Sequence, residues 1–227
     1  MVTVSASQEQ SGQGQSRQGQ PGTGGSWALV ERLACAEGSA THPHRRALVE
    51  GVATHRDLSD VIHALCAVHG RHPDMVEEAL FHAAHPDAHD WLREVAEGFA
   101  AERGYLARLV SAAGPLPSTP GQAASETALS AQRHALAMLA RSDRRGCATG
   151  AVAALALDWL AIRPVLDRAA ERFGIVPVPD RMPPANANAL AGLEPGAERA
   201  LAFGAQQLLA QVRGLWDLLE TRAGARA

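Results

Sequence analysis

The chain has 227 residues, enough for one medium-sized domain with a substantial hydrophobic core. Alanine and leucine dominate and aromatic residues make up only 4%, so helix-forming residues far outnumber strand-forming ones and an all-α protein is predicted. The net charge of -3 gives no general electrostatic reason to bind nucleic acid or an anionic membrane, and neither is expected as a partner.

The first 25 residues are rich in glutamine, glycine and serine, as in SGQGQSRQGQPGTGG. Such a composition cannot bury enough apolar surface to fold by itself. Residues 1–25 are therefore predicted to be a disordered tail.

Residues 26–85 carry the pattern of three or four short helices, expected to form a subdomain that packs on the rest of the chain. The clearest of them repeats apolar residues at 3-4-3 spacing over 58–68, with Asp57 predicted to cap its start and Gly70 its end. Pro73 is predicted to open the last short helix in its first turn, where proline is tolerated.

Four long amphipathic segments follow, each with apolar residues three and four positions apart. This spacing is typical of a four-helix bundle, which is predicted for residues 86–223. The expected helices span about 87–113, 121–141, 146–173 and 196–222.

The connections between these segments limit the topology. The first two are short and predict antiparallel neighbours. The third, over residues 174–195, is proline-rich and 22 residues long. It could be a wandering loop, or it could run the length of the bundle, roughly 40 Å at 1.5 Å per helical residue, and make the last two helices parallel.

The location of the protein is inferred from its cysteines and its N-terminus. Cys35, Cys66 and Cys147 are widely separated, which fits reduced thiols better than a disulfide framework. The N-terminal composition has no basic region followed by an apolar one, so no secretion signal is expected. The most apolar run, Cys147 to Ile162, contains Asp158 and is predicted to be a core helix rather than a membrane span. A soluble, cytoplasmic protein is expected.

Function in a helical bundle usually depends on polar side chains that face inward. Glu102, Gln132 and Asp158 interrupt the apolar stripes, and Gln207 and Gln211 flank the last one. If the helices fold back at their short connections, Glu102 lies level with residues 132–134, and the layer of Asp158 is roughly 6 Å away. The predicted polar layer or ligand pocket is Glu102, Gln132, Arg133, His134, Asp158, Gln207 and Gln211.

This polar layer has two interpretations. Glu102, His134 and Asp158 could bind iron, manganese or zinc, as carboxylates and histidines do in ferritin-like bundles. Alternatively, the buried groups pair with one another: Glu102 with Arg133, and Asp158 with a glutamine, Tyr105 or Arg213. The chain has no Glu-x-x-His motif, so the second interpretation is favoured and no cofactor is expected.

Nine of the ten histidines lie between residues 42 and 89. The series His63, Cys66, His69 and His72 has a spacing of three, which drifts around a helix and does not bring four ligands to one ion. Capping or surface roles are therefore expected for the histidines. No phosphate-binding glycine loop, GxSxG, HExxH or GxGxxG motif is present, so no catalytic residue is assigned.

Several stretches carry a family resemblance: DLSDVIHALCAVHGRHP from Asp57, GQA from Gly121, QRH from Gln132, DWLAIR from Asp158 and GAQQLLAQ from Gly204. They resemble an uncharacterised alphaproteobacterial family of all-helical proteins, over most of the chain after residue 26. The resemblance implies a family of unknown function and transfers no activity or site.

Three classes of function are weighed. A helical bundle that acts through protein contacts, as a homodimer or with another protein, is favoured because every helix has an apolar face and no chemistry is recognisable. A metal- or small-ligand-binding bundle is the alternative. A transcriptional regulator would need a basic helix-turn-helix near the N-terminus, and residues 26–85 carry histidines and acidic residues instead.

Overall fold

The computed structural model describes residues 25–51, 53–82, 88–184, 190 and 196–226. These residues form eight α-helices and one 3-10 turn, with no strand among them, which confirms the predicted all-α class. The predicted N-terminal tail falls on residues 1–24, outside the described residues, and on Gly25 at the start of the first helix.

Two of the short helices, α3 and α4, start at polar caps that the sequence did not predict. Thr54, rather than Asp57, caps α3, because its Oγ1 accepts the backbone N–H of Asp57 at 3.1 Å. Asp74 caps α4 by accepting the N–H groups of Val76 and Glu77, so Pro73 lies just outside that helix. The elements are α1 (Gly25–Glu37), η1 (Ser39–Thr41), α2 (Pro43–Glu50), α3 (His55–His69) and α4 (Met75–His82).

The four long helices begin and end within two residues of their predicted ends. Gly146 and Gly174 flank the third of them at φ of 90° and 72°, a left-handed backbone that glycine adopts without strain. The helices are α5 (His89–Ala113), α6 (Gln122–Ala140), α7 (Cys147–Phe173) and α8 (Ala197–Gly224).

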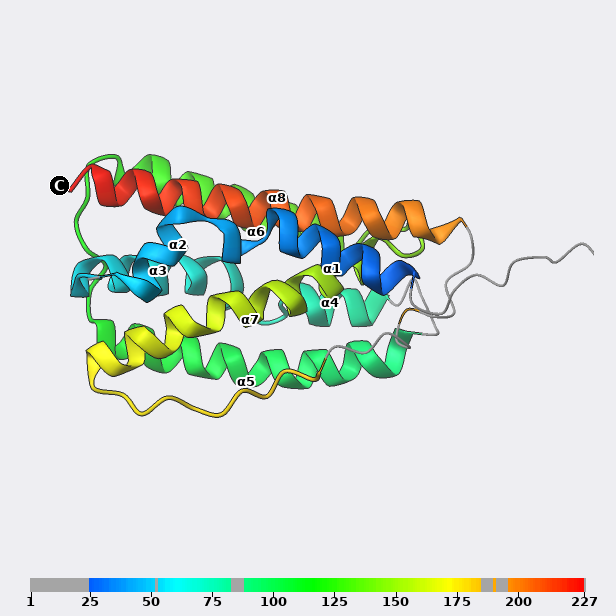
Figure 1. Cartoon of the computed structure of the whole chain (residues 1–227), viewed down its shortest axis with the longest axis horizontal. Helices are drawn as coiled ribbons and strands as arrows, with labels where there is room; N and C mark the ends of the chain where they lie inside the picture. The colour runs from blue at the N-terminus through cyan, green and yellow to red at the C-terminus, as the bar shows by residue number, and fades with distance from the viewer. Residues whose placement is uncertain (1–24, 52, 83–87, 185–189, 191–195, 227) are drawn as a thin grey trace, which may run out of the picture.

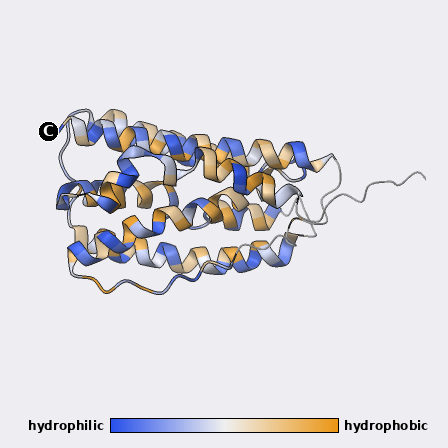
Figure 2. Ribbon diagram, viewed as in Figure 1, coloured by the Kyte–Doolittle hydropathy of each residue, from blue (hydrophilic) through white to orange (hydrophobic). Residues whose placement is uncertain are grey.

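The helix α7 lies at the centre and packs against α8, α1, α5, α3 and α6 (Figure 1). The short connection between α5 and α6 predicted antiparallel neighbours, but α3 and α4 lie between these two helices and pack against both (Figure 1). The long helices therefore share their interior with the short ones. One hydrophobic core includes Val30, Leu65, Phe99, Leu155 and Leu208, and each helix also keeps polar residues (Figure 2).

The helices α7 and α8 run parallel, which settles the topology left open by the sequence. A Cβ at Gly150 would overlap the backbone oxygen of Leu201, and a Cβ at Gly204 would overlap that of Cys147, so the two helices touch backbone to backbone near their first turns. The segment after Phe173 returns along α5 (Figure 1), where the backbone of Arg181 lies against Gly98.

The central helix is also long and apolar enough to cross a membrane by length and composition, because it extends well beyond Ile162. In its most apolar 18-residue window, however, 72% of the residues are buried inside the protein. This burial is typical of a core helix, as predicted for the run that starts at Cys147.

Candidate functional site

Glu102 lies on the inner face of α5 and is fully buried. Arg163 Nη1 donates to its Oε1 at 2.7 Å, and Trp159 Nε1 donates to its Oε2 at 3.0 Å. Burial raises the pKa of the Glu102 carboxyl, and the hydrogen bond from Trp159 opposes that rise. Since donors from α7 take both oxygens, the carboxylate links α5 to α7.

Arg163 is the centre of this buried network. Its Nε donates to Asp167 Oδ1 at 3.0 Å, and its Nη2 donates to the backbone oxygen of Val178. Its guanidinium carbon lies 4.8 Å from the ring centroid of Tyr105, whose hydroxyl donates to the same Asp167 oxygen at 3.0 Å. One cation therefore holds the segment after α7 against α5 and α7, and each of its three nitrogens has a partner inside the protein.

Asp158 belongs to a second, separate network. Its Oδ1 accepts the backbone N–H of Ser39 at 2.6 Å, and its Oδ2 accepts the Ser39 hydroxyl at 2.5 Å. The indole of Trp216 donates to the same hydroxyl at 2.7 Å. Burial raises the pKa of the Asp158 carboxyl, and the hydrogen bonds from Ser39 oppose this. The contacts fix the η1 turn between α7 and α8.

The residues of the predicted polar layer therefore lie in several separate places and do not form one layer. Glu102 pairs with Arg163 instead of Arg133, and Asp158 pairs with Ser39. Gln132 Nε2 donates to the backbone oxygen of Gln211 at 2.6 Å, between α6 and α8. The other predicted residues line surface cavities: Arg133 and His134 on one flank of α6, and Gln207 and Gln211 on the other.

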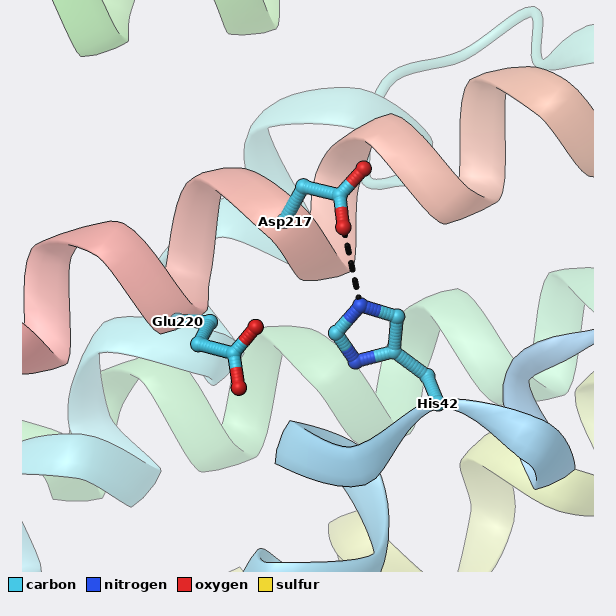
Figure 3. A group of neighbouring side chains, drawn as sticks. All are labelled: His42, Asp217 and Glu220. Carbon is cyan, nitrogen blue, oxygen red and sulfur yellow. Dashed lines mark hydrogen bonds and ion pairs between the residues drawn. The ribbon is translucent and has the colours of Figure 1, made fainter.

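Among the described residues, one group of three metal-ligand side chains has its ligand atoms within 4.8 Å of one another: His42, Asp217 and Glu220 (Figure 3). Glu102, His134 and Asp158 do not form such a group. The carboxylates of the group lie three residues apart on α8, and His42 approaches them from the start of α2 (Figure 3).

The hydrogen bonds of His42 bear on whether this group suits a metal. Its Nδ1 accepts the backbone N–H of His44 at 3.2 Å, and its Nε2 lies 3.0 Å from Asp217 Oδ1. An accepting Nδ1 carries no proton, so Nε2 carries it and donates it to Asp217. A metal at Nε2 would need the opposite tautomer, with a donating Nδ1. This geometry favours a helix cap over a metal ligand.

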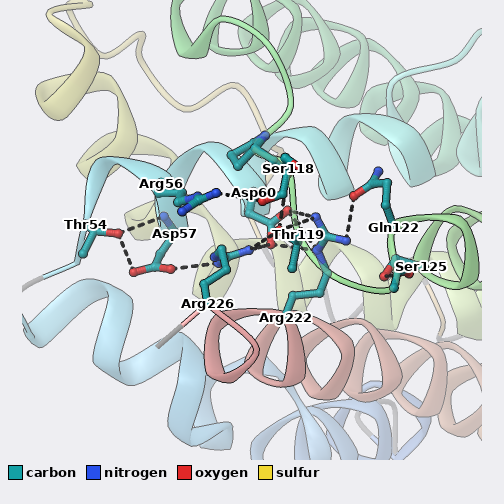
Figure 4. Close-up of polar contacts among 12 residues, drawn as sticks. Thr54, Arg56, Asp57, Asp60, Ser118, Thr119, Gln122, Ser125, Arg222 and Arg226 are labelled. Atoms are coloured by element: carbon teal, nitrogen blue, oxygen red, sulfur yellow. Dashed lines mark hydrogen bonds and ion pairs between the residues drawn. The ribbon is translucent and has the colours of Figure 1, made fainter.

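A third buried network joins α3 to the last turns of α8. It was not predicted from the sequence. Asp60 accepts two donors of Arg222, at 2.8 and 2.7 Å, and Nη1 of Arg226 at 2.7 Å (Figure 4). Arg226 also donates to Thr119, in the segment between α5 and α6. The sequence did contain a sign of this network. Arg222 follows Leu219 by three residues and so continues the 4-3 apolar stripe of α8, which predicts a buried arginine that needs a carboxylate partner.

The comparisons with known proteins agree with the resemblance seen in the sequence. The model of a family of unknown function (DUF6975) matches residues 34–227. No curated protein and no solved structure matches the chain. The matched residues run from the last turns of α1 to the C-terminus and contain all three buried networks. The chain therefore belongs to the family of unknown function DUF6975.

Proposed function

We propose that this protein acts through protein–protein contacts and pairs with a second copy of itself through the outward side of α6. The observation that carries the proposal is the exposure of two large apolar side chains beside each other. Met138 of α6 is 56% exposed and Phe203 of α8 is 43% exposed. Both line one cavity of about 390 Å³ at the surface between the two helices, together with Ala135 and Leu139.

The outward side of α6 extends this apolar surface. We use the term α6 face for Ala124, Ala128, Ala131, Ala135 and Met138, which follow a 4-3-4-3 spacing and are exposed or half-buried. Exposed sides of helices in folded domains are normally polar. The spacing is that of a helix that packs along another helix, and alanine side chains allow a close approach.

The charges on α6 also support pairing with a second copy. The helix has two charged residues, Glu126 and Arg133, and a helical turn of 3.6 residues points both away from the α6 face. Arg133 lines a cavity on the other flank instead. A two-fold axis through the α6 face would therefore bring alanine and methionine side chains together without opposing the two charges of α6 itself.

Sedimentation velocity of the full chain at about 1 to 100 μM tests the proposal, since pairing depends on concentration. We expect the wild-type protein to shift from monomer to dimer over this range, and Met138→Glu or Phe203→Glu to remain monomeric. The control is Leu160→Glu, because Leu160 is a helical leucine with a similar exposure of 52% on α7. It should dimerise like the wild type.

Two results would contradict the proposal. One is a wild-type protein that sediments as a monomer throughout the concentration range. The other is an equal loss of the dimer in Met138→Glu and Leu160→Glu, which would mean that any added charge disrupts assembly and that the α6 face has no special role.

A further inference from the structure

A cavity of about 740 Å³ lies on the other flank of α6, between that helix and the turn that joins α3 to α4. Its apolar part is formed by Val68, Met75 and Leu136, which are buried. Its polar rim carries arginines, histidines and the hydroxyls of Thr127 and Ser130. An apolar floor with a few polar groups around it is the usual form of a small-molecule site.

The two carboxylates of this cavity are already engaged. Asp74 accepts two backbone N–H groups of α4 and a guanidinium N–H of Arg103. Glu78 accepts two donors of Arg141, at 2.8 and 2.7 Å, and these hydrogen bonds lower the pKa of its carboxyl. Neither carboxylate therefore neutralises another cation of the rim.

Two arginines and one histidine of the rim have no carboxylate partner within the part of the chain that the structure describes. Arg133 has one weak contact, from its Nη2 to the hydroxyl of Ser130 at 3.5 Å. Arg71 and His134 have no hydrogen bond or ion pair among the described residues. A guanidinium presents a planar fork of N–H donors that matches the oxygens of a carboxylate or a phosphate.

We propose that this cavity binds a small phosphate monoester that carries an apolar group. Arg71 and Arg133 bind the phosphoryl oxygens, His134 and the hydroxyl of Ser130 complete the polar contacts, and the apolar group lies over Leu136 and Met75. Two guanidiniums without a carboxylate partner favour a doubly charged ligand over a singly charged carboxylate. The cavity borders the α6 face of the proposed dimer at Ala131, but Met138 and Phe203 do not line it.

Isothermal titration calorimetry of the full chain with phenyl phosphate tests the site. We expect saturable binding with one ligand per chain. Binding should weaken by about tenfold or more in Arg133→Gln and in Arg71→Gln, because each loses a charge-assisted pair. The matched control is Arg108→Gln, since Arg108 is an exposed arginine of α5 that does not line the cavity. It should bind like the wild type.

Two further ligands test the chemical class. Inorganic phosphate should bind more weakly than phenyl phosphate, because it does not use the apolar floor, and benzoate should bind more weakly because it carries one charge. The site is overturned if phenyl phosphate shows no saturable binding or if Arg108→Gln weakens it as much as Arg133→Gln. Equal or tighter binding of benzoate overturns the phosphate assignment, and equal binding of inorganic phosphate overturns the role of the floor.

Discussion

The indole Nε1 of Trp159 donates to Oε2 of Glu102 at 3.0 Å, while the other carboxylate oxygen pairs with Arg163. A buried carboxylate with both oxygens satisfied in this way contributes to the fold rather than to chemistry. The same holds for Asp158 with Ser39 and for Asp60 with Arg222. The two features to which we assign a function lie instead on the surface, on both flanks of α6.

Glu102→Gln tests the first network. The substitution keeps the size of the side chain but leaves the buried Arg163 without its buried counter-charge, so the free energy of unfolding should fall by about 3 kcal/mol. Urea denaturation measures it. The control is Glu97→Gln on the exposed side of α5. A change in Glu102→Gln no larger than that in Glu97→Gln would show that the pair is dispensable for stability.

Ser39→Ala tests the network around Asp158. It removes the acceptor of Trp216 Nε1 and the donor to Asp158 Oδ2, and both remaining groups are buried. We expect a loss of about 2 kcal/mol in the free energy of unfolding, the usual result of leaving buried polar groups unpaired. Ser111→Ala, at an exposed position of α5, should change it little. A thermal midpoint equal to that of Ser111→Ala would contradict this account.

His69 gives the stability a pH dependence with a defined sign. The ring is buried edge-on against Trp159 and Phe99, its Nε2 has no hydrogen-bond partner among the described residues, and burial lowers its pKa to about 4. The unfolded chain takes up this proton near pH 6.5, but the folded chain does so only near pH 4. The unfolded state therefore binds more protons in this window, and stability falls as the pH falls through it.

The variant His69→Leu isolates this effect from the other titrating groups. Between about pH 7.5 and about pH 5, the wild-type protein should lose roughly 2 kcal/mol relative to His69→Leu. Urea denaturation at both pH values measures the difference. Parallel pH profiles for the two proteins would mean that His69 gains a proton in the folded state as easily as in the unfolded state.

Gly150 tests the backbone contact between α7 and α8. In Gly150→Ala, the new Cβ would overlap the carbonyl of Leu201, so the helices must move apart, with an expected loss of about 2 to 3 kcal/mol in the free energy of unfolding. Gly104 is the matched control, because it lies within α5 with open space around it. Gly104→Ala should raise stability by about 0.5 to 1 kcal/mol. Similar effects of both substitutions would contradict the close approach.

The sequence predicted the ends of the long helices well, because proline and glycine act locally on the backbone. It predicted side-chain partners poorly, because these depend on which helices are neighbours. Folding α5 directly onto α6 placed Glu102 beside Arg133, but α3 and α4 lie between the two helices. The partner is Arg163, which follows Trp159 by one turn on α7 and was not seen as a buried position.

Hydrogen exchange of the full chain at two concentrations, one above and one below the dimer midpoint, tests the central claim most directly. A second copy packed on the α6 face would reduce the local unfolding of α6. The amides of α6 should therefore exchange more slowly at the higher concentration. Amides of α5, away from the proposed interface, should not change. Exchange in α6 that is independent of concentration, or protection that appears on α5 instead, would contradict pairing through the α6 face.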